Sequence, residues 1–260
     1  VPTSGLLDPD AATNVVAGWD VVYVPYCDGS AFLGDSELAD ASMPGGTRHH
    51  RGIRNLSAAI DVALAKFPNP RRILLAGSSA GGYGTITGTG IVRLAYPKTP
   101  LIVFNDAGLG LDNPANPGSQ IRKDEWKYMQ FIPAGCEGCQ EDQSLVPAWG
   151  LEHDPTLRLA AFSAYEDAVI GATFLGMTGP DFKALLLEKT GAIQALYPDR
   201  FRRFLVPGTS HTTLLADAGP SPNGSGIHGF LTVVEGQSVS EWTQAFVDGT
   251  AEWTDRLIGE

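Results

Sequence analysis

Ser79 lies at the centre of Gly77–Gly81, whose sequence GSSAG fits the pattern G-x-S-x-G. An apolar run, Ile73–Ala76, precedes it, and a stretch of small residues follows. This order is typical of a nucleophile elbow, in which a strand turns sharply into a helix and holds a serine in a strained conformation. The two outer glycines remove side chains that would collide in such a turn. The pattern predicts that Ser79 is a nucleophile and that the Ala80 N–H, at the helix N-terminus, stabilises an oxyanion.

His211 is the candidate base for this serine. A serine nucleophile needs a nearby base, and in the elbow arrangement that base follows a later strand. Among the five histidines, His211 comes just after an apolar run, Phe201–Val206. The alternative is His228, in a glycine- and proline-rich loop over Leu214–Gly229. We therefore predict that His211 accepts the serine proton.

Asp167 is the candidate acid that orients the base. In this arrangement the residues occur in the order serine, acid, histidine, each just after a strand. Asp167 follows the apolar run Leu157–Phe162 and meets both conditions. Its neighbour Glu166, and Asp106 at the end of the run Pro100–Asn105, remain alternatives. For Asp106 we expect hydrogen bonds to loop backbone near the site, a common role of aspartates at strand ends.

The chemistry of a serine, an aspartate and a histidine in this order is acyl transfer. The histidine removes the serine proton during attack on an ester carbonyl, and water activated by the same histidine then hydrolyses the acyl-enzyme. A metal site is not expected, because the conceivable ligands Asp28, Asp35, His49 and His50 have no metal-binding spacing. The sequence therefore predicts catalysis without a metal or another cofactor.

Apolar runs bounded by turn residues alternate with helix-like stretches along the chain. The expected strands are Val21–Pro25, Arg72–Ala76, Pro100–Asn105, Leu157–Phe162 and Phe201–Val206. The expected helices are Ser57–Phe67, the segment from the elbow to about Tyr96, Asp181–Leu196 and Ser240–Ile258. This alternation predicts the α/β class, with a mostly parallel sheet and helices on both faces. We expect one domain over residues 1–260, with a cap-like insertion at about residues 109–156.

The composition is that of an ordinary globular protein with an acidic surface. The chain has 260 residues, of which 43% are hydrophobic, and a formal net charge of −11. No cluster of Lys and Arg could hold phosphates, which excludes a nucleic-acid partner. No stretch approaches the ~18 apolar residues of a membrane span. The expected partner is therefore the substrate, a small-molecule or carbohydrate ester.

The cysteines indicate an oxidising compartment. Cys136 and Cys139 form a C-x-x-C pair in a loop-like region, and no second pair completes a four-cysteine zinc site. We expect a local disulfide between them in a secreted or periplasmic protein, with Cys27 left unpaired. The first residue is Val1 and no leader-like segment follows, so we expect a processed mature protein or a fragment.

Several segments resemble motifs of the pectin acetylesterase and Notum family. They are Tyr26–Asp35 (YCDGSAFLGD), Gly77–Gly82 (GSSAGG), Asp106–Gly108 (DAG), Leu111–Asn113 (LDN) and Ser210–His211. The resemblance runs from about Trp19 to the C-terminus. It implies an α/β-hydrolase fold, a secreted location, disulfides and a serine carboxylesterase with the triad Ser79, Asp167 and His211. It also implies removal of small acyl groups from carbohydrate, or of a fatty acyl group in the Notum branch.

The start of this chain departs from the family's pattern. Family members begin with an apolar strand and a glycine-rich segment that supplies a second oxyanion N–H, and the residues before Trp19 do not resemble them. We therefore expect an N-terminally shortened member. In it the turn at Asp28–Gly29 replaces the missing donor, with the Gly29 N–H acting together with the Ala80 N–H.

The expected function is hydrolysis of acetyl or other short-chain acyl esters, including esters on carbohydrate. We place Asp28, Ser30 and Tyr83 among the residues that bind the substrate. One alternative is a broader-specificity esterase, a lipase or a polyester hydrolase, because the cap-like region carries no clear code for a substrate. Another is a catalytically impaired relative that binds carbohydrate or lipid, because only one oxyanion donor is visible.

Overall fold

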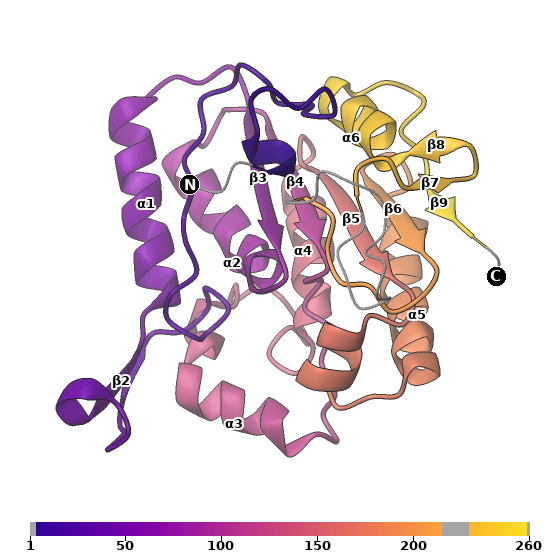
Figure 1. Cartoon of the computed structure of the whole chain (residues 1–260). Coiled ribbons are helices and arrows are strands. Elements are labelled where there is room, and N and C mark those ends of the chain that lie inside the picture. Colours follow the sequence, from indigo (N-terminus) through magenta and orange to yellow (C-terminus); the bar gives the residue numbers. More distant parts are fainter. Residues whose placement is uncertain (1–3, 215–228, 259–260) are drawn as a thin grey trace.

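The computed structural model describes residues 4–214 and 229–258. Its centre is a parallel sheet with the strand order β3-β4-β5-β6-β9 (Figure 1). The strands are β3 (Ile73–Ser78), β4 (Leu101–Asp106), β5 (Arg158–Ala164), β6 (Phe201–Val206) and β9 (Arg256–Leu257). The last four of the expected apolar runs are therefore strands at nearly the expected positions.

Helices cover both faces of this sheet, because alternate side chains of each strand point to opposite faces. One face packs in a hydrophobic cluster with helices α1 (Gly52–Lys66), α2 (Ala80–Ala95), α4 (Val146–His153) and α5 (Gly179–Leu196). On the other face, Phe104 and Phe204 pack against Trp242 of helix α6 (Val239–Asp248), with ring centroids 6.0 and 5.4 Å apart. The fold is α/β-hydrolase-like, as the sequence predicts.

Shorter elements lie outside the sheet. The antiparallel pairs are β1 (Ser36–Ala39) with β2 (Thr47–His50) and β7 (Val233–Val234) with β8 (Gln237–Ser238). The 3-10 helices are η1 (Gly5–Leu7), η2 (Pro44–Gly46), η3 (Tyr128–Phe131) and η4 (Gln143–Leu145). Between β4 and β5 the chain also forms helix α3 (Pro117–Trp126), which lies at the end of the sheet to which the strand arrows point (Figure 1). This segment corresponds to the expected cap-like insertion, and its role as a cap stays a prediction.

The expected strand Val21–Pro25 is wrong for this structure. The segment joins no sheet, and Val21, Val22 and Tyr23 are exposed. Among the described residues, no backbone hydrogen bond connects it to a strand. A run of β-branched and aromatic residues favours extended backbone, but a strand also needs partners for its N–H and C=O groups.

The expected helix Ser240–Ile258 is too long. Helix α6 ends at Asp248, and Gly249 closes it with a φ of 73°, a left-handed conformation that glycine adopts readily. The chain then turns, and Trp253 packs against Trp242 in the core, with ring centroids 6.3 Å apart. The apolar spacing after Asp248 therefore reflects burial beyond a turn and not a continued helix.

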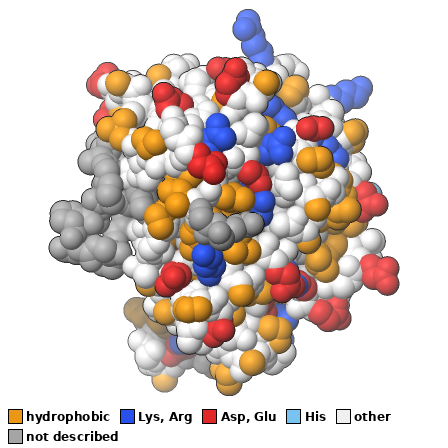
Figure 2. All heavy atoms as spheres, turned by 90° about the vertical axis from the view of Figure 1, so that its right-hand side faces the viewer, with side chains coloured by type: hydrophobic (Ala, Val, Ile, Leu, Met, Phe, Trp, Pro, Cys, Tyr) orange, Lys and Arg blue, Asp and Glu red, His pale blue; other side chains and the backbone are white. Residues whose placement is uncertain are grey.

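The predicted disulfide between Cys136 and Cys139 is present, and Cys27 is free and exposed. In the described part of the chain no helix is long and apolar enough to cross a membrane. Figure 2 shows one face of the molecule, on which acidic and basic side chains are interspersed around hydrophobic ones. Charges mixed in this way give little attraction for a polyanion.

Candidate active site

Ser79 lies in the sharp turn that joins β3 to α2. Its φ of 56° and ψ of −115° are strained for a residue with a side chain. The Ser79 N–H donates to Asp106 O at 2.8 Å, which ties the turn to the end of β4. Gly77 is required here, because a Cβ on it would lie 2.1 Å from Gly81 O. The structure therefore has the strand–turn–helix geometry of a nucleophile elbow, with Ser79 half-buried.

Asp167 and His211 contact each other just beyond the ends of β5 and β6. His211 Nδ1 lies 2.8 Å from Asp167 Oδ2. The other carboxylate oxygen accepts the N–H groups of Val169 at 2.9 Å and Ile170 at 3.0 Å. Asp167 is 1% exposed, so these bonds fix its orientation. A carboxylate only accepts hydrogen bonds, so Nδ1 donates and His211 Nε2 is left as the basic nitrogen.

His211 Nε2 is available to accept a proton. This atom is buried and has no hydrogen-bond partner within the described part of the chain. No hydrogen bond joins it to Ser79 there, and such contacts often tighten only when substrate binds. Ser79, Asp167 and His211 follow the carboxyl ends of three parallel strands, and these ends meet at one edge of a sheet. The Ala80 N–H, the first of helix α2, has no acceptor among the described residues and is free to bind an oxyanion.

Asp106 binds the loop backbone, as expected from its place at a strand end. Its carboxylate accepts the Ser78 hydroxyl at 2.5 Å, the Thr213 N–H at 3.0 Å and the Leu214 N–H at 3.0 Å. Burial raises the pKa of Asp106 to about 6, although these hydrogen bonds act in the opposite direction. Asp106 thus connects the elbow to the loop that carries His211.

Glu166, the carboxylate next to Asp167, is not paired with the candidate base in this structure. It lies beside the start of α5, where a Cβ on Gly179 would meet its carboxylate at 2.5 Å. No hydrogen bond joins Glu166 to His211 among the described residues. The second candidate for the base, His228, lies outside the described residues. Asp167 is therefore the acid best placed to orient His211.

The hydroxyl of Ser30 forms hydrogen bonds within its own loop. It is fully buried, donates its hydroxyl to the Asp28 carboxylate and accepts the Gly34 N–H at 3.0 Å. Asp28 in turn contacts His50 Nδ1 through its backbone oxygen at 3.0 Å. The hydroxyl of Ser30 is therefore used within the loop in this structure, and its placement among substrate-binding residues stays a prediction. The same role for Asp28 stays a prediction.

The loop that follows reaches the first turns of α2. A Cβ on Gly84 would lie 2.8 Å from the Phe32 side chain, and one on Gly81 would lie 3.9 Å from its ring. Ala31 and Phe32 both have positive φ, at 52° and 60°. The exposed Gly29 has no acceptor for its N–H among the described residues, so it is available as a donor. Its role as the second oxyanion donor stays a prediction.

Tyr83 belongs to the core and not to an open binding surface. It is 4% exposed, and its hydroxyl donates to Leu111 O at 2.8 Å. Its ring packs edge-on against Phe174, with centroids 5.3 Å apart. Burial raises the pKa of Tyr83 far above its ordinary value. The hydroxyl of Tyr83 is therefore already bound within the protein, and the expectation that Tyr83 binds substrate stays a prediction.

The residues considered as metal ligands have other partners. Asp35 pairs with Arg54, and His49 Nδ1 lies 3.1 Å from Glu37. No group of three or more His, Cys, Asp or Glu side chains suited to a metal ion occurs in the described part of the chain.

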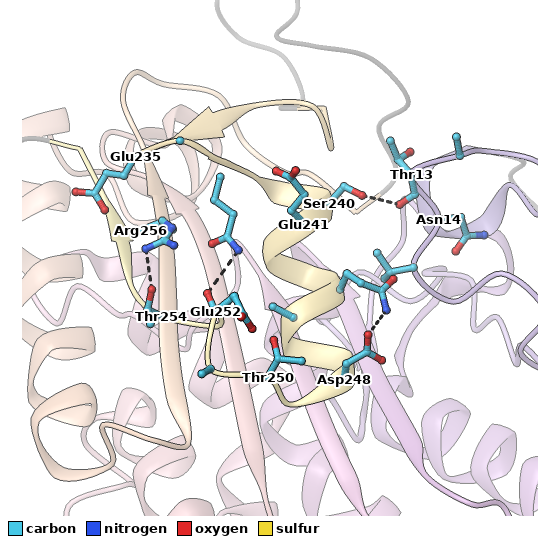
Figure 3. A pocket seen from close by; sticks show the side chains of 17 residues that line it. Thr13, Asn14, Glu235, Ser240, Glu241, Asp248, Thr250, Glu252, Thr254 and Arg256 are labelled. Carbon is cyan, nitrogen blue, oxygen red and sulfur yellow. Dashed lines mark hydrogen bonds between the residues drawn. The ribbon is translucent and has the colours of Figure 1, made fainter.

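A pocket of about 820 Å³ lies along α6 (Figure 3). Thr13 and Asn14 border it on one side, and Ser240 Oγ donates to Thr13 O at 3.2 Å across it. Its charged side chains are those of Glu235, Glu241, Asp248, Glu252 and Arg256. Its lining residues include no histidine or cysteine and none of Ser79, Asp167 and His211. This pocket therefore offers no nucleophile beside a base.

The element that carries the acid could not be foreseen from the sequence. Asp167 is the N-cap of a π-helix, η5 (Ala168–Phe174), whose far end contacts Arg122 of α3. The segment has no apolar periodicity that would reveal a helix of this kind. One sequence motif is connected with this element: Asn113 of the LDN segment Leu111–Asn113 donates to Leu175 O, just beyond the end of η5.

Comparisons with known proteins point to one family. A family model described as pectinacetylesterase matches residues 1–136 of the 260, a region that contains Ser79. Pectin acetylesterase 11 of Arabidopsis thaliana is 36% identical over 108 residues, and pectin acetylesterase 7 of the same plant is 33% identical over 108 residues. Each match covers 40% of this chain and 27% of the relative, so the chain spans about a quarter of the length of these curated relatives. Because the family model covers more than half of it, the chain belongs to the pectinacetylesterase family.

Proposed function

We propose that this protein is a serine carboxylesterase that removes acetyl or other short acyl groups from carbohydrate esters. The observation that carries the proposal is the 2.8 Å contact between His211 Nδ1 and Asp167 Oδ2, beyond strand ends that share an edge with the elbow at Ser79. A serine, a histidine and a buried carboxylate in this arrangement are the parts of an acyl-transfer triad. Membership of the pectinacetylesterase family supports the same chemistry.

The proposed reaction has two steps. His211 Nε2 takes the Ser79 proton as Oγ attacks the ester carbonyl, and Asp167 stabilises the imidazolium that forms. The alcohol leaves with that proton, and the acyl group stays on Ser79. Water then attacks the acyl-enzyme with His211 as the base again, which releases the acid and restores the serine. The Ala80 N–H, together with the Gly29 N–H, stabilises the oxyanion in both steps.

The names of the relatives support carbohydrate acetyl esters as the substrate class. Both matched plant proteins are named pectin acetylesterases. We propose that the substrate of this chain is likewise an acetyl ester on a carbohydrate. We also propose a location outside the cytosol, which the disulfide between Cys136 and Cys139 supports.

Active-site labelling tests the nucleophile and its base. A fluorophosphonate probe reacts with an activated serine, so we expect one-to-one labelling of Ser79. The variant His211→Ala should lose the labelling, because the serine proton then has no acceptor. His153→Ala is a matched control, since this exposed histidine lies at the end of α4 and stacks on Trp149. Absence of labelling in folded wild-type protein would contradict the proposal.

A panel of esters then separates the substrate classes. We expect kcat/KM to be highest for acetylated sugars and acetyl aryl esters and to fall as the acyl chain lengthens. Activity that rises with chain length, or that extends to polyesters, would favour the broader esterase or lipase. Binding of carbohydrate or lipid without turnover would favour an impaired relative.

A further inference from the structure

The acid of the proposed triad lies at one end of the π-helix η5. The carboxylate that contacts His211 also accepts the N–H groups of Val169 and Ile170, in the first turn of this helix. The orientation of the Asp167 side chain is therefore coupled to the position of η5. Single π-helical turns are rare and occur frequently at functional sites.

The other end of η5 is held by Arg122. Its guanidinium lies over the Phe174 ring, 4.0 Å from the centroid, and Nη1 donates to Phe174 O at 3.2 Å. One residue further along, Asn113 Nδ2 donates to Leu175 O at 2.9 Å. The Phe174 ring also packs on Tyr83 of α2. The end of η5 is thus fixed between the segment that follows β4 and the helix that follows the elbow.

Arg122 is itself fixed by partners within the protein. Its Nη2 donates to Ser119 Oγ at 2.9 Å and lies 3.5 Å from Asp112 Oδ1. The side chain is only 16% exposed. Both terminal nitrogens therefore have protein acceptors, and the planar face is covered by Phe174. A guanidinium used in this way is suited to hold a protein segment rather than to bind a substrate.

We propose that Arg122 is a positioning residue for Asp167. Arg122 holds the Phe174 end of η5, and η5 carries Asp167 at its other end, where the carboxylate meets His211 Nδ1. The segment between β4 and β5, which lies at the carboxyl ends of the strands, then also holds the acid of the triad in position. This inference rests on the proposed function and deepens it.

A substitution that keeps the charge tests the proposal. Arg122→Lys retains a cation but loses the planar stacking on Phe174 and the paired contacts of the guanidinium. With 4-nitrophenyl acetate we expect kcat to fall by about 10-fold to 100-fold, because a displacement of ~1 Å in a reacting group has an effect of this order. We expect KM to remain unchanged, because Arg122 does not touch the substrate.

Arg200 provides a matched control. Its Nη1 donates to Leu151 O at 2.7 Å and to Asp154 O at 2.9 Å, and its guanidinium lies 5.1 Å from the centroid of the Tyr197 ring. These are the same kinds of contact as those of Arg122, but Arg200 lies just before β6, at the opposite edge of the sheet. Arg200→Lys should lower the melting temperature about as much as Arg122→Lys does and leave kcat unchanged.

A second measurement needs no turnover. The proton on His211 Nδ1, held by Asp167, should give a downfield NMR resonance in the wild type. We expect faster exchange with solvent to broaden this resonance in Arg122→Lys but not in Arg200→Lys. If the wild type shows the resonance and hydrolyses no ester, the proposed function fails, while the resonance still decides the role of Arg122.

Three results would overturn the proposal. The first is a wild-type kcat together with an unchanged resonance in Arg122→Lys. The second is a rise in KM alone, which would identify Arg122 as a substrate ligand. The third is an equal loss of kcat in both lysine variants, which would mean that Arg122 contributes to the stability of the fold in general and does not position Asp167.

Discussion

Asp167 binds three donors at once, and its two oxygens have different partners. One oxygen accepts from two backbone N–H groups and the other from His211 Nδ1. In Asp167→Asn the amide oxygen would keep the backbone bonds, whereas the NH₂ group would face Nδ1 and favour the wrong tautomer of His211. We expect kcat to fall by about 10⁴-fold, the size of this effect in a serine protease. Steady-state kinetics measures the fall, and thermal unfolding should show little change in stability.

Glu166 supplies the control for this assignment, because it is the neighbouring carboxylate. It lies beside Gly179 at the start of α5 and, among the described residues, forms no hydrogen bond or ion pair with His211. Glu166→Gln should therefore retain the wild-type kcat. A large loss in Glu166→Gln, with normal activity in Asp167→Asn, would reverse the assignment of the acid.

Chain order and strand ends could predict which polar residues meet, but not which are already bound. Asp167 and His211 follow neighbouring strands, and the structure has them in contact. Tyr83 lies in the helix after the elbow and Ser30 in the loop whose Phe32 reaches that helix, yet the hydroxyl of each is bound within the protein. Their partners come from distant backbone or from the fold of a loop, and no local pattern reveals such contacts.

Among the secondary-structure elements, the strands and helices with strong apolar patterns could be predicted. The exceptions have identifiable causes. Val21–Pro25 has the composition of a strand but no backbone partner among the described strands, and η5 follows Asp167 without any periodic signal. Helix α6 stops because Gly249 closes it, although apolar residues continue beyond. In each case the outcome depends on a partner or on a single backbone conformation rather than on composition.

The contact between α2 and the end of β4 depends on glycine at position 82. A Cβ on Gly82 would lie 2.7 Å from Gly108 Cα and 2.8 Å from Gly108 N, and backbone atoms cannot move aside cheaply. We expect Gly82→Ala to lower the free energy of unfolding by about 1–3 kcal/mol, the usual range for overpacking. We also expect it to displace the elbow and reduce kcat. Chemical unfolding and steady-state kinetics measure the two effects.

Gly90 is the matched control in the same helix. It is exposed, and a Cβ there would meet nothing within 4 Å. Gly90→Ala should therefore stabilise the protein by about 0.5–1 kcal/mol, because alanine restricts the unfolded chain and favours the helix. Equal stability of the two alanine variants would show that α2 can shift away from β4 without loss.

For the molecule as a whole, Asp106 joins three parts of the chain in the interior. Its carboxylate accepts from Ser78, beside the elbow, and from the N–H groups of Thr213 and Leu214, which follow His211. Burial raises its pKa from 3.8 to about 6, so the folded protein binds the proton more tightly than the unfolded chain does. The stability that this group contributes is therefore complete below the unfolded pKa and is lost as the pH rises through the folded pKa.

Asp106→Asn removes this titration while preserving the size of the side chain. The free energy of unfolding of the wild type, minus that of the variant, should fall by about 3 kcal/mol between about pH 4 and about pH 6, because only the wild type titrates there. Urea unfolding at a series of pH values measures this difference. In a Ser78→Ala background the fall should extend to higher pH, since the Ser78 hydrogen bond favours the charged form. A constant difference over this range would mean that Asp106 is ionised throughout, and that a permanent charge connects the elbow to the histidine loop.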